Sequence, residues 1–430
     1  LKKVDDKIVQ INILNRDKNT QEEYRGKIFI DATYEGDLAA AAGVPFRVGR
    51  EGKNEFGEPG AGSVYKYWHG PEMDASTFIG DNAVQAYNYR LCLTKNPNNK
   101  VPITKPLNYD RNEYTSIIDD VWTGRHTQAE MVNVTPEMLE ANRKHIAKGN
   151  PTMIPGDKWG LGKVVNLVEI PNEKTDANNQ HAAFVSSDLP EENWAWPTAG
   201  WTWRDKFATR LREYTEGLLW FAQNDKELPD HFRKAAREWG YAKDEYTASH
   251  YGFDSHATHK REPGMVHLNG FLGYPTSPYT VPYGVIVPKE VDNLLFPVPI
   301  SGSHIGFSTL RMEPCWMAMG QAAGVASSVA IDEKVKVRNI NISMMQDILL
   351  EQGTTLVYYK DVSLDDKDFS MVQYMGLRGF LPEWEARLDE AIEEQTLSYW
   401  KHFSKLNIKV QSGVSTRREV LNELYVKMKK

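Results

Sequence analysis

Cysteine is nearly absent from this 430-residue sequence, which has only Cys92 and Cys315. Two cysteines are too few for a disulfide framework, and they lack the paired spacing of a structural zinc site, so no metal site is expected. An apolar run of about 18 residues is also missing, because glycine, glutamine and a serine pair interrupt the best candidate, residues 317–331. The sequence therefore predicts neither a disulfide-stapled domain nor a membrane span.

A long block of lysine and arginine is missing too. The 51 Lys+Arg and 58 Asp+Glu residues give a formal net charge of −7. Because nucleic acids and anionic membranes bind clustered positive charge, neither is expected as a partner. The composition, 41% hydrophobic and 25% charged, is that of an ordinary globular protein, and the length predicts two or more structural units. No feature indicates a compartment or an oligomeric state.

The first informative segment, residues 27–45, predicts a buried strand, a tight turn and a short helix. Asp31 ends the strand, and the helix opens at Gly36 and Asp37. A helix start offers unpaired N–H groups and partial positive charge, which attract a phosphate or a carboxylate. Asp37 could instead cap its own helix, and physical chemistry alone favours that reading, although both roles can coexist.

The second segment, residues 293–324, predicts a strand, a polar loop and a helix that starts near Met312. Pro314 suits the first turn of this helix, and the small residues that follow allow close approach of another backbone. The loop carries His304 and Arg311. N–H groups and a cation in this arrangement suit the pyrimidine edge of a flavin, where charge develops on reduction. The alternative is a glycine-rich core helix with two surface polar residues.

Together the two segments resemble the FAD-dependent oxidoreductase family of the broad glutathione-reductase-like flavoprotein group. The family pattern IDATG-x-GDLA-x-x-AG matches residues 30–43, and the pattern NLL…S-x-x-H…R-M-x-P…GQAAG matches residues 293–324. The resemblance extends over roughly residues 1–333. Four further similar segments are QAYNYRLCLT at 85–94, KTDANN at 174–179, YTEGLLWF at 214–221 and PYGVIVPK at 282–289.

The resemblance implies an α/β fold, with an incomplete FAD-binding Rossmann-like domain, an inserted substrate domain and a helical C-terminal region. The expected boundaries are 1–62 for the first part of the FAD-binding domain, 63–283 for the substrate domain, 284–333 for the closing FAD segment and 334–430 for the helical region. FAD is the implied cofactor and a small molecule the implied substrate. The implied reaction is hydride transfer between an organic substrate and the flavin.

Three departures from the family pattern stand out. The G-x-G-x-x-G unit that holds the FAD pyrophosphate does not occur, and the sequence starts at Leu1, so a glycine-fingerprint βαβ unit is expected upstream. Tyr34 stands where the family commonly has glycine. Relatives also carry a longer, arginine-containing stretch between the positions of Glu245 and Tyr251, so part of the substrate domain is expected to be missing.

The resemblance implies two residues with catalytic roles. His304 could accept a proton while hydride moves to the flavin, and the alternative is a purely structural role in the loop. Arg311 is expected to act as a cation at the flavin edge, and the alternative is that it forms an ion pair on the surface. The cofactor-binding residues implied by the two motifs are Asp31, Thr33, Gly36, Asp37, Ser301, Arg311, Met312 and Glu313.

The expected substrate residues suit a polar, hydroxyl-rich ligand. They are Arg90, Asn178, Asn179, Asp254, His256 and Tyr283. The residues Asp254-Ser-His256 are too close in sequence to form the catalytic triad of a hydrolase, and His256 with His259 lack the nearby carboxylate or thiolate ligands of a zinc site. The alternative to a substrate-binding role is a solvated turn. A polyhydroxylated substrate is therefore expected. The rival function is a non-catalytic carbohydrate-binding or scaffold protein that retains a flavoprotein-like fold.

Overall fold

A computed structural model describes residues 1–65, 71–128, 132–244, 257–262, 265–271 and 277–429. The chain forms two compact units. The first comprises Leu1–Phe46, Thr276–Gly302 and Gly306–Lys430, and the second comprises Arg47–Pro275 and Ser303–Ile305. These divisions differ from the expected boundaries at residues 62 and 283, and the assignment of each segment to FAD or substrate remains a prediction.

The first unit opens with a small antiparallel sheet of β1 (Lys2–Val4), β2 (Lys7–Asn15) and β3 (Thr20–Tyr24). The strand β3 lies within the polar stretch 15–24. Its side chains are mostly exposed, so the strand has no apolar face that a hydrophobic pattern could reveal.

The strand β4 (Phe29–Ile30) pairs in parallel with β12 (Leu294–Leu295), from the second sequence motif. The buried Asn293 fixes this junction. Its amide nitrogen donates to the carbonyls of Ile8 and Lys27, at 2.8 and 2.9 Å, and its oxygen accepts from the N–H of Ile8 at 2.9 Å. One side chain therefore ties three distant segments together.

Residues 283–299 hold two short apolar runs around a charged turn, which predicts two strands, and only the second run contains a strand, β12. The first is the 3-10 helix η4 (Tyr283–Ile286), which follows Pro282. Proline fixes its own φ near −65°, and the carbonyl of Pro282 accepts from the N–H of Val285 at 3.1 Å, which closes a turn instead of extending a strand.

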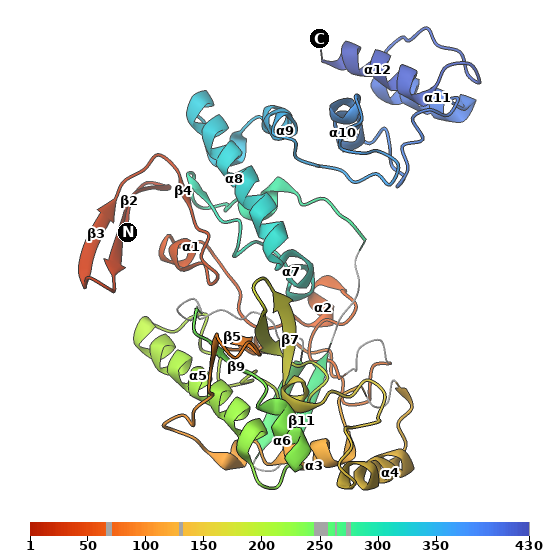
Figure 1. Cartoon of the computed structure of the whole chain (residues 1–430). Helices are drawn as coiled ribbons and strands as arrows, with labels where there is room; N and C mark the ends of the chain where they lie inside the picture. The colour runs from red at the N-terminus through yellow and green to blue at the C-terminus, as the bar shows by residue number, and fades with distance from the viewer. Residues whose placement is uncertain (66–70, 129–131, 245–256, 263–264, 272–276, 430) are drawn as a thin grey trace. The chain divides into compact units, whose positions relative to one another are not determined.

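The helix expected near Met312 is confirmed as α8 (Glu313–Glu333), with proline in its first turn. A short helix, α7 (His304–Leu310), precedes it. After η5 (Val337–Asn339), α9 (Ile342–Glu351) packs against α8 (Figure 1). Their shared core is rich in alanine and valine from α8, which permits close packing.

The C-terminal region contains α10 (Phe369–Leu377), α11 (Glu394–Ser404) and α12 (Arg417–Met428), which are drawn in blue in Figure 1. They surround a hydrophobic core of their own, in which Trp400 is fully buried. Thr416 and Glu419 form a capping box at the start of α12. The helices expected in this region are present, joined by long connections.

The second unit is built on an antiparallel five-stranded sheet in the order β6-β9-β5-β8-β7. Its strands are β5 (Leu91–Thr94), β6 (Lys100–Val101), β7 (Val165–Ile170), β8 (Lys174–Asn179) and β9 (Gly240–Ala242). A separate hairpin is formed by β10 (Ala257–Glu262) and β11 (Met265–Phe271). Residues 52–283 have little sustained periodicity and are predicted from the sequence to be rich in loops, yet this sheet lies among them.

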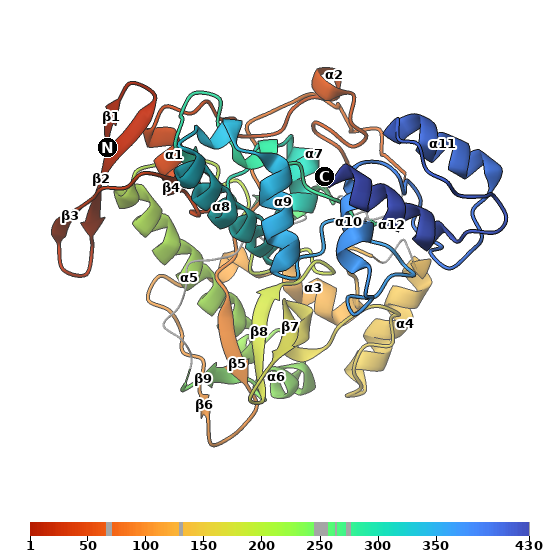
Figure 2. The ribbon, with the colours of Figure 1, turned by 90° about the horizontal axis from the view of Figure 1, so that it is seen from above.

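The long helix α5 (Trp201–Asn224) runs beside β5 and β8 (Figure 2) and shares the main core with them. The sequence predicts helices at residues 203–224, from the near-helical spacing of their apolar residues, and at residues 226–239. The first is confirmed by α5, whereas the second shortens to α6 (Asp230–Ala236), since Pro229 occupies its N-cap. The remaining helical elements are α2 (Lys53–Phe56), η1 (Arg111–Glu113), α3 (Ser116–Thr123), α4 (Pro136–Ala147) and η3 (Gly160–Lys163).

Candidate functional site

The turn after β4 is held by the side chains of Asp31 and Thr33. The buried Asp31 carboxylate accepts from the N–H and hydroxyl of Thr33, at 3.0 and 2.7 Å, and from the N–H of Ala39 at 2.8 Å. Thr33 Oγ1 accepts from the N–H groups of Gly36 and Asp37, at 3.1 and 3.3 Å. The helix α1 (Asp37–Ala41) has Gly36 at its N-cap, so the reading of Asp37 as the cap is wrong.

Gly36 brings this turn against the segment that follows β12. Its φ is 69°, in the left-handed region, and an added Cβ would lie 3.0 Å from the Cβ of Pro299. The N–H of Asp31 also donates to the carbonyl of Leu295 at 2.8 Å. Because β4 and β12 run parallel, both segments leave the pair at the same edge. The structure thus brings the two sequence motifs side by side.

The second motif runs into the N-terminus of α8, where Met312 is the N-cap and Glu313 the first helical residue. Arg311 directly precedes them and is only 6% exposed, so it is not a surface residue. Ser301 is exposed, and its N–H donates to the carbonyl of Val285 at 2.8 Å. A buried cation beside a helix N-terminus provides positive potential suited to an electron-rich ligand.

Tyr34, the departure from the family pattern, packs edge-to-face on Trp316 of α8. The ring centroids lie 5.2 Å apart and the planes meet at 77°. The larger residue therefore has a structural partner and links the turn after β4 to α8.

His304 forms a close pair with Glu51 in the second unit. Its Nδ1 lies 2.6 Å from Glu51 Oε2, and its backbone N–H donates to the same oxygen at 2.9 Å. Glu51 is 7% exposed, whereas the His304 side chain is 22% exposed. Burial acts to raise the pKa of Glu51, but the hydrogen bonds from His304 outweigh it and hold that pKa below its usual value.

The structure corrects the expected position of His304, which is not in a polar loop but is the first residue of α7. The neighbouring Ser303 donates its hydroxyl to Glu58 Oε1 at 2.8 Å. Glu51 and Glu58 therefore hold consecutive residues at the start of this helix. Neither glutamate was identified from the sequence, because each lies more than 200 positions from its partner.

The segment that carries Glu51 is braced by backbone pairing between Arg50 and Asp81. Their N–H groups and carbonyls exchange hydrogen bonds at 2.8 and 3.0 Å, and Arg50 Nε donates to Asp81 Oδ1 at 2.8 Å. Burial acts to raise the pKa of Asp81, but Arg50 outweighs it and the pKa is lowered. Gly49 and Gly80 permit the crossing, because an added Cβ would lie 2.2 and 2.7 Å from the facing carbonyl oxygens.

Two of the expected substrate residues, Asn178 and Asn179 at the end of β8, belong to a buried amide cluster. Asn178 Oδ1 accepts from the side chain of Asn88 and from the N–H of Asn179, both at 2.8 Å. Asn179 Nδ2 donates to Asp188 Oδ2 at 3.2 Å. Asn88 Oδ1 is buried and makes no hydrogen bond to a described residue. The sequence missed Asn88 and Asp188.

The other expected substrate residues have separate surroundings. Arg90 pairs with Asp176, Nε lying 3.1 Å from both carboxylate oxygens. Tyr283 belongs to the first unit, and its hydroxyl donates to the carbonyl of Val337 at 2.8 Å. Burial raises the pKa of Tyr283. Asp254 and His256 lie outside the described residues.

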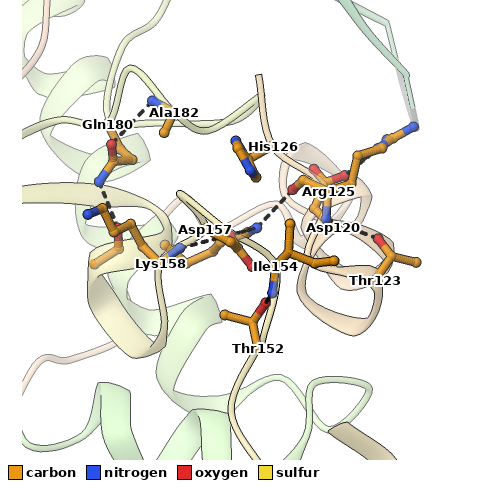
Figure 3. Close-up of polar contacts among 12 residues, drawn as sticks. Asp120, Thr123, Arg125, His126, Thr152, Ile154, Asp157, Lys158, Gln180 and Ala182 are labelled. Carbon is orange, nitrogen blue, oxygen red and sulfur yellow. Dashed lines mark hydrogen bonds and ion pairs between the residues drawn. The ribbon is translucent and has the colours of Figure 1, made fainter. Parts of the chain in front are cut away.

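A second polar cluster of the same unit includes Asp120, Arg125 and Asp157 (Figure 3), and buried Lys163 lies at its centre. Its Nζ donates to Asp157 Oδ1 at 2.5 Å and to the carbonyl of Arg125 at 2.8 Å. Arg125 Nε donates to Asp120 Oδ1 at 3.0 Å. Burial raises the pKa of Asp120, against the charges of Lys163 and Arg125. These ions neutralise one another, which is typical of a structural network.

His126, next to this cluster, has both ring nitrogens engaged. The N–H of Gln128 donates to Nδ1 at 3.1 Å, so Nε2 carries the proton and donates to the carbonyl of Pro155 at 3.0 Å. Burial lowers the pKa of His126. Among the described residues, no group of three or more His, Cys, Asp or Glu could hold a metal ion.

The mixed helix and sheet content and the paired motifs define an α/β protein of the flavin-binding class. More specifically, the chain belongs to the family described as FAD dependent oxidoreductase, whose model matches residues 1–349. The family binds FAD, and the protein is accordingly a flavin oxidoreductase. No curated protein and no solved structure matches the chain. No helix in the described part of the chain is long and apolar enough to cross a membrane.

Proposed function

We propose that the protein oxidises a polyhydroxylated organic substrate by hydride transfer to FAD, with the two paired motifs as part of a Rossmann-like cofactor site. The observation that supports this most strongly is the parallel pairing of β4 with β12, together with the close contact of Gly36 with Pro299. In α/β sheets, ligands bind at the carboxyl ends of the parallel strands, where both motifs continue.

The residues at this edge suit FAD by their chemistry. The turn of Asp31, Thr33, Gly36 and Asp37 would lie along the cofactor, and the segment from Ser301 to Glu313 would approach the flavin ring with the buried cation of Arg311. FAD, when bound, supplies the two-electron acceptor. Arg311 would stabilise negative charge that develops near the helix start.

His304 is proposed to accept the proton that a substrate hydroxyl loses as its carbon gives up hydride. The products then balance as a carbonyl compound, a protonated His304 and a reduced cofactor. The neutral amides of Asn88, Asn178 and Asn179 support a hydroxyl-rich substrate, because amides both donate to and accept from hydroxyl groups. Arg90, Asp254, His256 and Tyr283 remain proposed substrate residues.

Rapid mixing of the native flavin-loaded enzyme with a panel of sugars and polyols tests this function, with bleaching of oxidised flavin as the readout. We expect His304→Gln to retain FAD and to slow bleaching by about 10²–10⁴-fold, the usual contribution of a positioned general base. His402→Gln, on an exposed site of α11, is the matched control. Failure of every polyol to bleach the flavin would refute the substrate class, and equal rates in both variants would refute the role of His304.

A further inference from the structure

The pairing of His304 with Glu51 determines which ring nitrogen is available as a base. A carboxylate only accepts hydrogen bonds, so the 2.6 Å contact requires a proton on His304 Nδ1. The N–H of Glu51 also points at Nδ1, but at 3.3 Å, and the shorter charge-assisted bond dominates. In the neutral ring, Nε2 is therefore the unprotonated nitrogen, and it makes no hydrogen bond to a described residue.

The surroundings of Glu51 fix it in this orientation. The carboxylate is buried, and a buried charge needs partners, which the backbone and ring of His304 provide on one oxygen. Arg47 lies 3.7 Å from the other oxygen and also pairs with Glu55 at 2.8 Å. The backbone before Glu51 is held by the glycine-lined crossing of Arg50 and Asp81, so the whole segment has little freedom to move.

Both negative and positive groups surround His304. Glu51 is in direct contact, the negative charge of Asp81 interacts with the ring, and Glu58 lies against the adjacent Ser303. Arg47 and Arg50 act in the opposite sense but are themselves paired with carboxylates. An imidazolium formed at His304 would therefore have Glu51 as its direct counterion on the Nδ1 side.

We propose that Glu51 is a positioning residue for His304, which holds the ring as the Nδ1–H tautomer, leaves Nε2 to receive the substrate proton and stabilises the imidazolium that results. This inference rests on the proposed role of His304 as proton acceptor. Glu51 does not itself touch the reacting atoms in this scheme; its effect passes entirely through the histidine ring.

The direct test is the tautomer, read from the imidazole ¹⁵N shifts of the native full-length protein, with His304→Gln used to assign the signals. Wild type should show a protonated Nδ1. In Glu51→Met the carboxylate is lost while the backbone N–H at 3.3 Å remains as a donor, so the proton should move to Nε2. A protonated Nε2 in neutral wild-type His304 would overturn the proposal, whatever the enzyme's activity.

The kinetic test compares flavin reduction in Glu51→Gln, Glu51→Met and the control Glu55→Gln, which removes a neighbouring carboxylate that does not contact His304. The Gln variant retains an oxygen for Nδ1–H but loses the charge, so it should be slower than wild type and faster than Met. In the Met variant the rate of flavin reduction should fall by about 10²–10⁴-fold, as expected when a general base is misplaced. Glu55→Gln should match wild type; a loss equal to that of Glu51→Gln would overturn the assignment.

A double-mutant comparison separates this proposal from the proposed function. If Glu51 acts through His304, then adding Glu51→Gln to His304→Gln should cause no further loss. If Glu51→Gln slowed the His304→Gln variant as much as it slows wild type, the proposal would be overturned and the role of His304 would stay intact. An unchanged rate in His304→Gln alone would instead refute the proposed function, and with it the catalytic consequence of Glu51. Glu51→Gln is isosteric, so it serves as the test if Glu51→Met does not fold.

Discussion

Gly36 gives the most direct test of how the two motifs fit together, because Gly36→Ala introduces two separable penalties. Alanine at φ 69° costs about 1–2 kcal/mol in the left-handed region. Its Cβ would also lie 3.0 Å from the Cβ of Pro299, a backbone-anchored ring, and overpacking of this kind costs about 1–3 kcal/mol. The sum, about 2–5 kcal/mol, is a large share of the usual free energy of unfolding.

Gly43 supplies the matched control for this prediction. It has φ 81°, but no atom lies within 4 Å of an added Cβ. Gly43→Ala should therefore carry only the backbone penalty, and the difference between the two variants isolates the contact with Pro299. Urea unfolding followed by tryptophan fluorescence measures both. Equal losses of unfolding free energy would show that the turn and the segment after β12 are not in tight contact, and would refute the packing of the two motifs.

Three further predictions concern stability. Because burial lowers the pKa of His126, its contribution to the stability of the fold is complete above about pH 6.5 and is lost as pH falls through the folded-state pKa. The fall in Tm between pH 7.5 and about 5.5 should therefore be smaller in His126→Gln than in wild type. An unchanged fall in Tm would contradict this. Lys163→Met should lower the free energy of unfolding by about 3–5 kcal/mol, because it leaves the Asp157 carboxylate without its cation. Denaturant titrations should show that adding Asp157→Asn recovers part of this loss. Tyr34→Leu should lose about 0.5–1.5 kcal/mol of aromatic coupling in a double-mutant cycle with Trp316→Leu, and a coupling near zero would refute the contact.

The elements that the sequence predicted correctly have strong local signals. The strand, turn and helix of residues 27–45 follow from an apolar run, a glycine and an alanine-rich stretch, and α8 and α5 follow from their proline start and their helical periodicity. The polar residues Asp31 and Thr33 act as the helix cap from a distance, which no cap rule for adjacent residues would have found.

The hairpin of β7 and β8 was missed because its pattern is inverted. The buried positions of β8 include Thr175, Asn178 and Asn179, so polar side chains occupy the places where apolar ones would signal a strand. The turn did leave a trace, since Asn172 and Glu173 both adopt positive φ, which asparagine tolerates. Burial of amides is a tertiary effect and could not be read from the local sequence.

The role of Glu51 was not predicted from the sequence, for a different reason. Its partner His304 is 253 positions away, and no local spacing links a glutamate to so distant a histidine. The glycines around it, at 49, 52, 62 and 80, were the available signal, since closely crossing backbones require residues without a Cβ. The sequence could therefore indicate a tight crossing in this segment, but not which carboxylate the crossing would place.

The parallel pair of β4 and β12 also constrains the order in which the chain can fold. Phe29 and Ile30 cannot make their backbone hydrogen bonds until Leu294 and Leu295 have been synthesised, and the whole of the sheet in the second unit lies between them in sequence. During translation the amino-terminal strand must wait while the intervening residues emerge and fold on their own local contacts. Closure of so long a loop carries an entropic cost that the short strand pair cannot offset alone, so α8 and its core must assemble at the same time.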